Sequence, residues 1–493
     1  MKTGFRTCLL VWMALSTVWM TVIPAQATPA VGGGEFAELA DYIEAQFPAT
    51  GLPGMAVGVV RGGETVFLGG YGMDGPAKNN VTPQTPFVIG SVSKGFTSLA
   101  VMQLVEADQI DLDAPVQTYL PWFTLADPQA AAKITIRDLL NQTSGLGYND
   151  GTRPIWDQPG EFTLEARIRQ MTDLELLREP GTAFEYSNFN YMLLGAVVEA
   201  VSGKTYQQYI QEHIFTPLNM GNSFTSASQA PGLAQPHRWW FGFPVYTAAP
   251  YLTDALPAGY IISSAEDMAA YLASLQSRYP ALLSPAGYAL MHDSCVPSGG
   301  ENSYCFGWVR GPFGGVEALF HEGAAEGYYS IVALDPASGI GVLVLSNANS
   351  MVSAPARDLA PAVLGHLVNG TPLEVKRSFW TTYLVIDLVV LAVSGGLIWS
   401  LTRQTRWSRK LAGKPPSGFG GWFGKVILPV LAEFIIPFIV LVFLPQGAGF
   451  PLWKVMGIFQ PDLTAWVMLV VALFILRGLL RLGLAFSVVR GKK

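Results

Sequence analysis

Two pairs of short apolar runs lie near the two ends of the middle part of the chain. Residues 55–60 and 65–68 flank Arg61-Gly62-Gly63-Glu64, and residues 329–334 and 340–345 flank a loop of small residues and proline. Short apolar runs joined by turns of this kind are typical of β-hairpins. The pattern therefore predicts one strand pair at each end of this region.

The sequence between the strand pairs has a helical pattern. Residues 91–107 place apolar side chains three or four positions apart, and residues 191–201 form a second apolar helix that ends at Ser202-Gly203. Strands at both ends thus enclose a largely helical centre. This order predicts a single body of the α/β (α+β) class.

Three long apolar segments close the chain, at about residues 379–401, 424–444 and 464–484. Each is long enough to cross a hydrocarbon core of ~30 Å as a helix. The composition agrees, because 50% of the residues are hydrophobic and 13% are charged, against roughly 25% charged in an ordinary soluble domain. We therefore expect three transmembrane helices.

Basic residues gather on one side of these segments. The connection from the first to the second segment and the end of the chain hold no acidic residue and the following basic ones: Arg403, Arg406, Arg409, Lys410, Lys414, Lys425, Arg490, Lys492 and Lys493. The positive-inside rule places both stretches in the cytoplasm. Three crossings then place residues 28–378 outside, in the periplasm or the extracellular space.

The beginning of the chain independently predicts export. Residues 1–27 contain Lys2 and Arg6, an apolar run over residues 8–23, and Ala25-Gln26-Ala27, which has the form of a signal-peptide cleavage site. The alternative is an uncleaved anchor helix. The apolar run is shorter than the ~20 residues that a span needs, so the pattern favours a cleaved signal peptide.

Charge is distributed unevenly along the chain. The net charge of −6 combines +2 over residues 1–27, −18 over residues 28–376 and +10 over residues 377–493. A nucleic-acid-binding protein needs a basic face on its folded domain. The acidic body therefore argues against nucleic acid and leaves a lipid bilayer and a small-molecule or peptide substrate as the expected partners. The sequence does not give the oligomeric state.

Only three cysteines are present. Cys8 lies in the N-terminal apolar run, and Cys295 and Cys305 are ten residues apart in the body. An exported domain permits a disulfide between the latter two. Sequence does not give the Cα separation that a disulfide needs, so a bridge and two free thiols both remain open.

A serine and a lysine with helical spacing occur at the start of residues 91–107. In Ser91-Val92-Ser93-Lys94, Ser91 and Lys94 are three residues apart and share a helical face. They can act as nucleophile and proton acceptor, and a helix N-terminus stabilises negative charge on the serine oxygen. The alternative is a capped surface helix with a solvated lysine.

Two further motifs supply groups for the same chemistry. In Tyr186-Ser187-Asn188, a nearby ammonium would lower the pKa of the phenol, so that it can carry a proton to a leaving group, and Asn188 can hold a substrate carbonyl. In His321-Glu322-Gly323-Ala324, Gly323 allows a substrate to approach the strand closely. Each motif alone is also compatible with an ordinary loop or turn.

The Ala324 motif completes an arrangement for acyl transfer. The backbone N–H groups of Ala324 and Ser91 can bind an oxyanion together, and His321 can donate a hydrogen bond to the substrate. The order S-x-x-K, Y-x-N, H-x-G, with about 95 and 135 residues between the motifs, is far more specific than any one of them.

With these motifs the chain resembles the serine β-lactamase and penicillin-binding-protein superfamily, and most of all the class C β-lactamases and related serine hydrolases. The likeness covers about residues 36–370 and includes residues 87–90, residues 134–146 and Gly307-Trp308. It implies an antiparallel sheet flanked by helices with a helical subdomain. It also implies Ser91 as the nucleophile, with Lys94 and Tyr186 as the bases.

Two positions depart from the family pattern. The third motif commonly begins with lysine, and this chain has His321 there. A fixed cation for a substrate carboxylate is thereby weakened, which favours peptidase or esterase activity over β-lactam hydrolysis. Many relatives also carry an acidic residue three positions before the nucleophile, where this chain has Val88.

The order of signal peptide, hydrolase and three spans is similar to that of membrane peptidases that remove an N-acyl-D-amino-acid cap from antibiotic or toxin precursors. Val88 and Asn188 do not match the pocket residues of that subgroup. We therefore expect a membrane-anchored serine hydrolase that acts outside the cytoplasm on amides or esters, including D-amino-acid peptides, with β-lactams as a further class. The alternatives are a peptidase of natural-product maturation and a penicillin-binding sensor that is acylated without turnover.

Other chemistries lack their motifs. Ser91 is not in a G-x-S-x-G elbow, His321-Glu322 does not extend to H-E-x-x-H, and the remaining histidines have no metal-ligand spacing. No phosphate-binding loop is present. The sequence predicts neither a metal nor another cofactor.

Charged residues also occur inside the apolar segments. Glu433 and Arg477 lie at similar depth, which predicts an ion pair, because an unpaired charge in the membrane is costly. Arg481 lies one turn nearer the end, where we expect it to extend to the interface. Such a pair either contributes to packing or forms a polar path, and packing is the favoured interpretation.

Overall fold

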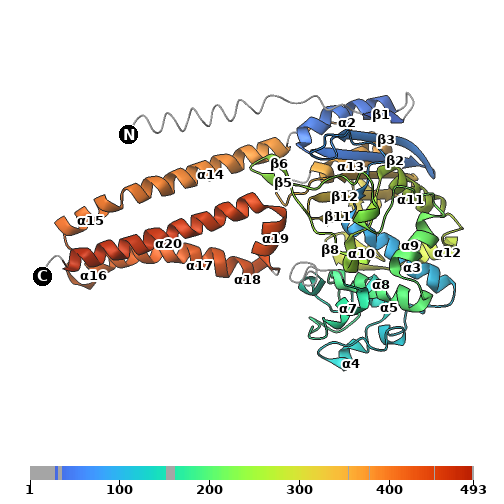
Figure 1. The fold of residues 1–493 in the computed structure, drawn as a ribbon, viewed down its shortest axis with the longest axis horizontal. Helices are drawn as coiled ribbons and strands as arrows, with labels where there is room; N and C mark the ends of the chain where they lie inside the picture. The colour runs from blue at the N-terminus through green and yellow to red at the C-terminus, as the bar shows by residue number, and fades with distance from the viewer. Residues whose placement is uncertain are drawn as a thin grey trace.

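The computed structural model describes residues 28–31, 36–151, 162–352, 355–376, 378–448 and 450–490. The predicted signal peptide, residues 1–27, lies outside the described residues. Figure 1 shows a body that contains the sheet, with long helices extending from one side of it.

A nine-stranded antiparallel sheet forms the centre of the body (Figure 1). The strand order is β1-β3-β2-β13-β12-β11-β10-β9-β8, so the first strands of the chain pair with the last strand of the body. The sheet strands are β1 (Thr28–Val31), β2 (Gly54–Arg61), β3 (Glu64–Gly72), β8 (Cys295–Gly299), β9 (Asn302–Cys305), β10 (Trp308–Phe313), β11 (Val316–Ala325), β12 (Tyr328–Asp335) and β13 (Ile340–Ser346).

Both predicted hairpins are confirmed. Strands β2 and β3 pair up to Arg61 opposite Glu64, and β12 pairs with β13. Gly62 and Gly63 have φ angles of +60° and +83°. A two-residue hairpin turn with positive φ at both central positions favours glycine, which explains the Gly-Gly pair.

The central strands are buried on both faces. Along β2, Met55 and Val57 pack on α2 (Ala37–Thr50) and α13 (Pro355–Asn369), whereas Ala56 and Val60 pack on the helical part of the body. A sheet covered on both faces has continuous apolar strands instead of alternating ones. This is why the hairpins read as unbroken apolar runs in the sequence.

The helical part lies against the second face of the sheet (Figure 1). Both predicted helices are present, as α3 and α8, and Gly203 ends α8 with a φ of +69°. Together with the sheet, they confirm the expected fold class. The helices are α3 (Ser93–Glu106), α4 (Pro128–Ala131), α5 (Ile136–Leu140), α7 (Leu164–Arg169), α8 (Asn188–Ser202), α9 (Tyr206–Ile210), α10 (Leu256–Gly259), α11 (Ala265–Ser277) and α12 (Pro285–Asp293).

A disulfide joins Cys295 and Cys305, with 4.1 Å between their Cα atoms. The two residues are direct partners in the β8–β9 pair. The structure thus answers the question that the spacing left open. A disulfide is characteristic of proteins outside the cytoplasm.

Three long apolar helices follow the body. They cover Phe379–Thr402, Gly418–Ala448 and Pro461–Val488, and each is long and apolar enough to cross a membrane. These helices suggest membrane association. The named elements are α14 (Ser378–Thr402), α15 (Gln404–Gly413), α16 (Gly418–Trp422), α17 (Leu428–Phe438), α18 (Leu444–Ala448), α19 (Leu452–Phe459) and α20 (Pro461–Arg490).

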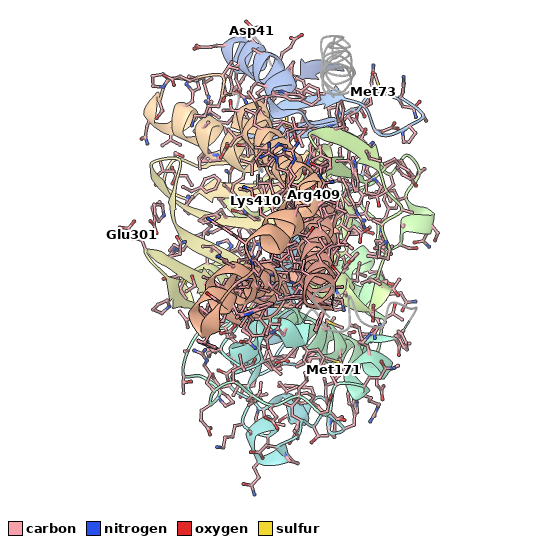
Figure 2. All side chains as sticks on the ribbon, turned by 90° about the vertical axis from the view of Figure 1, so that its left-hand side faces the viewer. Asp41, Met73, Met171, Glu301, Arg409 and Lys410 are labelled. Carbon is pink, nitrogen blue, oxygen red and sulfur yellow. A yellow bond between two sulfur atoms is a disulfide. The ribbon has the colours of Figure 1, made fainter. Side chains whose placement is uncertain are left out.

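The two ends of the helical bundle differ in chemistry. In Figure 1, α15 and α16 lie at the end far from the body, whereas α19 lies beside it. Arg409 and Lys410 of α15 are labelled in Figure 2, which views the molecule from that far end. The basic connection and the sheet-containing body therefore lie at opposite ends of the apolar helices.

The predicted ion pair within the bundle is confirmed. Arg477 Nε donates to Glu433 Oε2 at 2.6 Å. Arg481 Nη1 also lies 2.8 Å from Glu433 Oε1 and its Nε donates to Gln404 Oε1, and its extension to a membrane interface stays a prediction. Glu433 is only 3% exposed, and its two oxygens take one guanidinium each.

Candidate active site

A strand, a glycine turn and a helix position Ser91. The short strand β4 (Phe87–Val88) pairs with β7 (Ile262–Ser263), and Ile89 N then donates to the Ile261 carbonyl. Gly90 turns the chain with a φ of +52°, and α3 begins two residues after Ser91. Ser91 therefore lies at the positive end of a fourteen-residue helix, where negative charge is stabilised.

Lys94 lies one turn further along and is fully buried. Its Nζ is 3.1 Å from Ser91 Oγ, 2.7 Å from Asn188 Oδ1 and 2.6 Å from the Ala258 carbonyl oxygen. Burial lowers the pKa of Lys94 well below its usual value, because the low-dielectric interior disfavours the charged form. A neutral amine in this position donates to the two carbonyl oxygens and accepts the proton of the Ser91 hydroxyl.

Tyr186 approaches the nucleophile from another part of the fold. Its hydroxyl donates to Ser91 Oγ at 2.9 Å, and Lys94 Nζ lies 4.9 Å from the centre of its ring. The pKa of Tyr186 is raised, mainly by burial and against the effect of its bond to Ser91. The expectation of a lowered pKa is wrong, because burial dominates and Lys94 is not among the groups that shift the pKa of Tyr186. The lowered pKa of Lys94 and the raised pKa of Tyr186 suit a proton acceptor and a proton donor respectively.

Gln142 holds the Tyr186 segment in place. The Gln142 carbonyl accepts from Glu185 N at 2.8 Å, and its side-chain Oε1 accepts from Ser187 N at 2.9 Å. The same Oε1 accepts from Asn190 Nδ2, and Asn190 Oδ1 in turn accepts from Ser144 Oγ. Gln142 has a φ of +60°, so the segment after α5 is folded back to make these bonds.

Two glycines bring the nucleophile close to β11. A Cβ on Gly90 would meet Ala324 N, and one on Gly323 would meet the Ile89 carbonyl. Only the absence of both side chains lets the two backbones approach so closely. Ser91 and Ala324 consequently line the same cavity, and an oxyanion hole formed by their backbone N–H groups stays a prediction.

His321 lies behind this cavity wall. It is 6% exposed, its Nδ1 is 2.6 Å from the Glu322 carbonyl oxygen, and its ring is 6.5 Å from that of Tyr186. Burial, followed by the charge of Lys94, lowers the pKa of His321 to about 3. The imidazole is therefore neutral at physiological pH. A hydrogen bond from His321 to a substrate stays a prediction.

A cavity of about 260 Å³ opens on Ser91, Tyr186 and Asn188. Glu322, from the third motif, also lines it, and several further lining residues belong to no motif in the sequence: Tyr148, Pro250, Tyr260, Glu326, Ile458 and Phe459. Glu322 and Glu326 are each paired with an arginine, Arg357 and Arg238 respectively. In the described part of the chain, no group of three or more His, Cys, Asp or Glu side chains is arranged to hold a metal ion.

We expect Gly323→Ala to lower kcat by about 10²–10³-fold, the effect of losing one oxyanion donor. The added methyl meets the Ile89 carbonyl and the Ser330 hydroxyl, so β11 must move away from Ser91. Steady-state kinetics checks the rate, and thermal unfolding measures any loss of fold. The control is Gly221→Ala, whose methyl has nothing within 4 Å and should leave kcat unchanged. Parental kcat in Gly323→Ala would contradict the role of Ala324 N–H.

The residues brought together here form a complete set for acyl transfer. The hydroxyl of Ser91 lies within hydrogen-bond distance of an amine and of a phenol, and Ala324 lines the same cavity. This set matches nucleophilic catalysis through a covalent intermediate. The structure brings Ser91, Lys94, Tyr186, Asn188, Gly323 and Ala324 together around one cavity or directly against its wall.

Comparisons with known proteins agree with this arrangement. The sequence profile of the family described as "Beta-lactamase" matches residues 39–365. The chain is 27% identical to "Protein flp" of Staphylococcus aureus (strain MW2), over 69% of this chain and 70% of that protein. It is 28% identical to "Unguisins hydrolase ungD'" of Aspergillus campestris, over 70% of this chain and 67% of that protein.

A solved structure with a similar fold is the octameric penicillin-binding protein homologue from Pyrococcus abyssi. Its TM-score is 0.61 and its sequence identity 28%, over 69% of this chain and 78% of that chain.

Proposed function

The chain belongs to the beta-lactamase family of serine hydrolases, and we propose that it is a membrane-anchored enzyme that cleaves amides or esters through an acyl-enzyme on Ser91. The observation that carries this proposal is the position of Ser91 Oγ, 3.1 Å from Lys94 Nζ and 2.9 Å from the Tyr186 hydroxyl, in one open cavity. No single motif in the sequence indicates this chemistry as specifically as the three side chains do together.

The reaction begins with transfer of the Ser91 proton to neutral Lys94 as the oxygen attacks the substrate carbonyl. The carbonyl oxygen becomes negative and is stabilised by the N–H groups of Ser91 and Ala324. Tyr186 then protonates the leaving amine or alcohol and is reprotonated from Lys94, which leaves an acyl ester on Ser91. A water molecule attacks that ester and gives its proton to the same relay, which returns the proton to Ser91 Oγ as the ester bond breaks and the acid is released.

The proposed location of this reaction is outside the cytoplasm. The basic connection at the far end of the apolar helices supports a cytoplasmic position for that end, and the body at the opposite end would then face outward. The Cys295–Cys305 disulfide supports the same orientation. The anchoring helices and the exported body together favour substrates found at or beyond the membrane.

Peptide amides and esters suit the site better than substrates that need a fixed cation. His321 is neutral, so it does not supply the positive charge that would bind a substrate carboxylate. The relative named for unguisins is a hydrolase. From the family resemblance, we propose substrates that contain D-amino acids near the scissile bond, such as cell-wall or secreted peptides.

A substrate panel tests this proposal on the purified full-length protein. We expect hydrolysis of D-amino-acid amides or esters to exceed that of a chromogenic cephalosporin in kcat/KM by about 10–100-fold, since a hydrogen bond to a charged group contributes roughly 1.5–3 kcal/mol. L-amino-acid counterparts of the same substrates serve as the matched control for stereochemistry. Cephalosporin turnover as fast as that of the best amide or ester would contradict the proposal.

A narrower candidate is a peptidase that removes an N-acyl-D-amino-acid cap from a peptide natural product. The order of hydrolase body and three C-terminal helices favours it. The panel separates it, because such an enzyme cleaves N-acylated D-amino-acid amides and leaves simple esters of other acids largely intact.

A further inference from the structure

The wall of the catalytic cavity is completed by the C-terminal part of the chain. Ile458 and Phe459, at the end of α19, line the same cavity as Ser91 and Tyr186. More than 360 residues separate Phe459 from Ser91 in the sequence. Figure 1 shows α19 between the second and third apolar helices, on the side of the bundle next to the body.

A buried polar network fixes the end of α19. Gln460, which follows Phe459 directly, is fully buried. Its Nε2 donates to Tyr383 Oη at 2.8 Å and to Asp462 Oδ1 at 2.9 Å, and its Oε1 accepts from Ser350 Oγ at 2.9 Å. The network thus joins α14, α20 and the segment after β13 at one side chain.

Two further contacts tie α19 and the residues that flank it to the body. Asp462 Oδ2 accepts from Phe241 N at 2.9 Å, in the turn between β5 (His237–Trp240) and β6 (Phe243–Tyr246). Just before the start of α19, the ring of Phe450 lies 6.3 Å from the ring of Tyr148, and Tyr148 lines the cavity. The cavity wall formed by α19 is therefore held from both sides.

The lining of the cavity combines polar and apolar groups. Ser91, Asn188 and the paired carboxylates are polar, whereas Ile458, Phe459 and Pro250 are apolar. An apolar wall next to a nucleophile binds an apolar part of the substrate by excluding water from both. The wall then contributes to the choice of substrate as well as to its binding.

We propose that α19 is a substrate-binding element, and that the enzyme prefers substrates with an apolar group of aromatic or branched aliphatic size near the scissile carbonyl. This inference rests on the proposed hydrolase function and adds the substrate group that the apolar wall selects. The apolar helices are then part of the active site, because they deliver one of its walls, in addition to anchoring the body.

Two p-nitrophenyl esters with the same leaving group test the inference on full-length protein, one acetylated and one phenylacetylated. The Phe459→Ala variant should lower the ratio of phenylacetyl to acetyl kcat/KM about tenfold, the range expected for loss of one apolar contact in a pocket. Labelling of Ser91 by a serine-reactive phosphonate counts the intact sites in each preparation, so misfolded protein does not enter the ratio. Phe459→Leu, which keeps an apolar side chain, should retain most of the preference.

The matched control is Met456→Ala on the same helix, since Met456 does not line the cavity. It should leave the ratio at the parental value. An unchanged ratio in Phe459→Ala, or an equal fall in Met456→Ala, would overturn the inference while the hydrolase function stands. Failure of the parent to turn over either ester would overturn the proposed function and, with it, this inference.

Discussion

Ser91→Ala should lower kcat by at least about 10⁴-fold, as loss of a catalytic serine does in other serine hydrolases. The nucleophile is the one group that no neighbour replaces, because Lys94 and Tyr186 both act through its oxygen. The measurement is steady-state hydrolysis of the best substrate from the panel. Labelling by a serine-reactive phosphonate should be lost at the same time.

Ser93→Ala is the matched control for this change. Ser93 lies two residues away and is fully buried, and its Oγ accepts from Ile261 N at 3.1 Å. Its loss leaves one buried N–H without a partner, which destabilises the fold by about 1–3 kcal/mol. Because Ser93 Oγ contacts neither Lys94 nor Tyr186 in the described hydrogen bonds, labelling should persist. Equal labelling of Ser91→Ala and the parent would refute the assignment.

Lys94→Met should lower kcat/KM by about 10³-fold, within the range for loss of a general base. Methionine fills a similar volume but accepts no proton. Lys94→Arg places a guanidinium there that stays protonated and accepts no proton, so it should be no more active than Lys94→Met. Rescue by arginine would show that the charge, and not the proton transfer, is what the reaction needs.

The pH dependence of the parent enzyme tests the same role. Only neutral Lys94 accepts the Ser91 proton, and its pKa is lowered by burial from the usual 10.5. The value of kcat/KM should therefore rise with pH as Lys94 loses its proton, and should reach its plateau well below pH 10.5. A rise centred at the ordinary lysine value would contradict the buried, neutral amine.

The reactive side chains were easier to predict from the sequence than the residues that surround and position them. Ser91 and Lys94 are neighbours on one helix, so their spacing alone brings them together. Tyr186 could be included only through the order of the motifs, because its distance from Ser91 depends on how the segment after α5 folds. The direction of its pKa shift was predicted wrongly, since the sequence does not show the burial that raises the pKa of Tyr186.

Other parts of the site have no sequence signal of their own. Gln142 acts through two backbone bonds to residues more than forty positions away, and a glutamine in a turn gives no indication of this. Ile458 and Phe459 lie in an apolar stretch where every position looks like lipid contact or packing. The need for glycine at positions 90 and 323 follows from the close approach of two backbone segments, which the sequence does not show.

The most direct test of the acyl-enzyme account is time-resolved intact mass spectrometry of the parent during turnover, with the modified peptide located after a rapid quench. The account predicts a mass increase equal to the acyl group on the peptide that contains Ser91, which forms during turnover and disappears once the substrate is consumed. A permanent adduct would instead identify a sensor that is acylated without release. Sustained turnover with no acyl group on Ser91 would contradict the account.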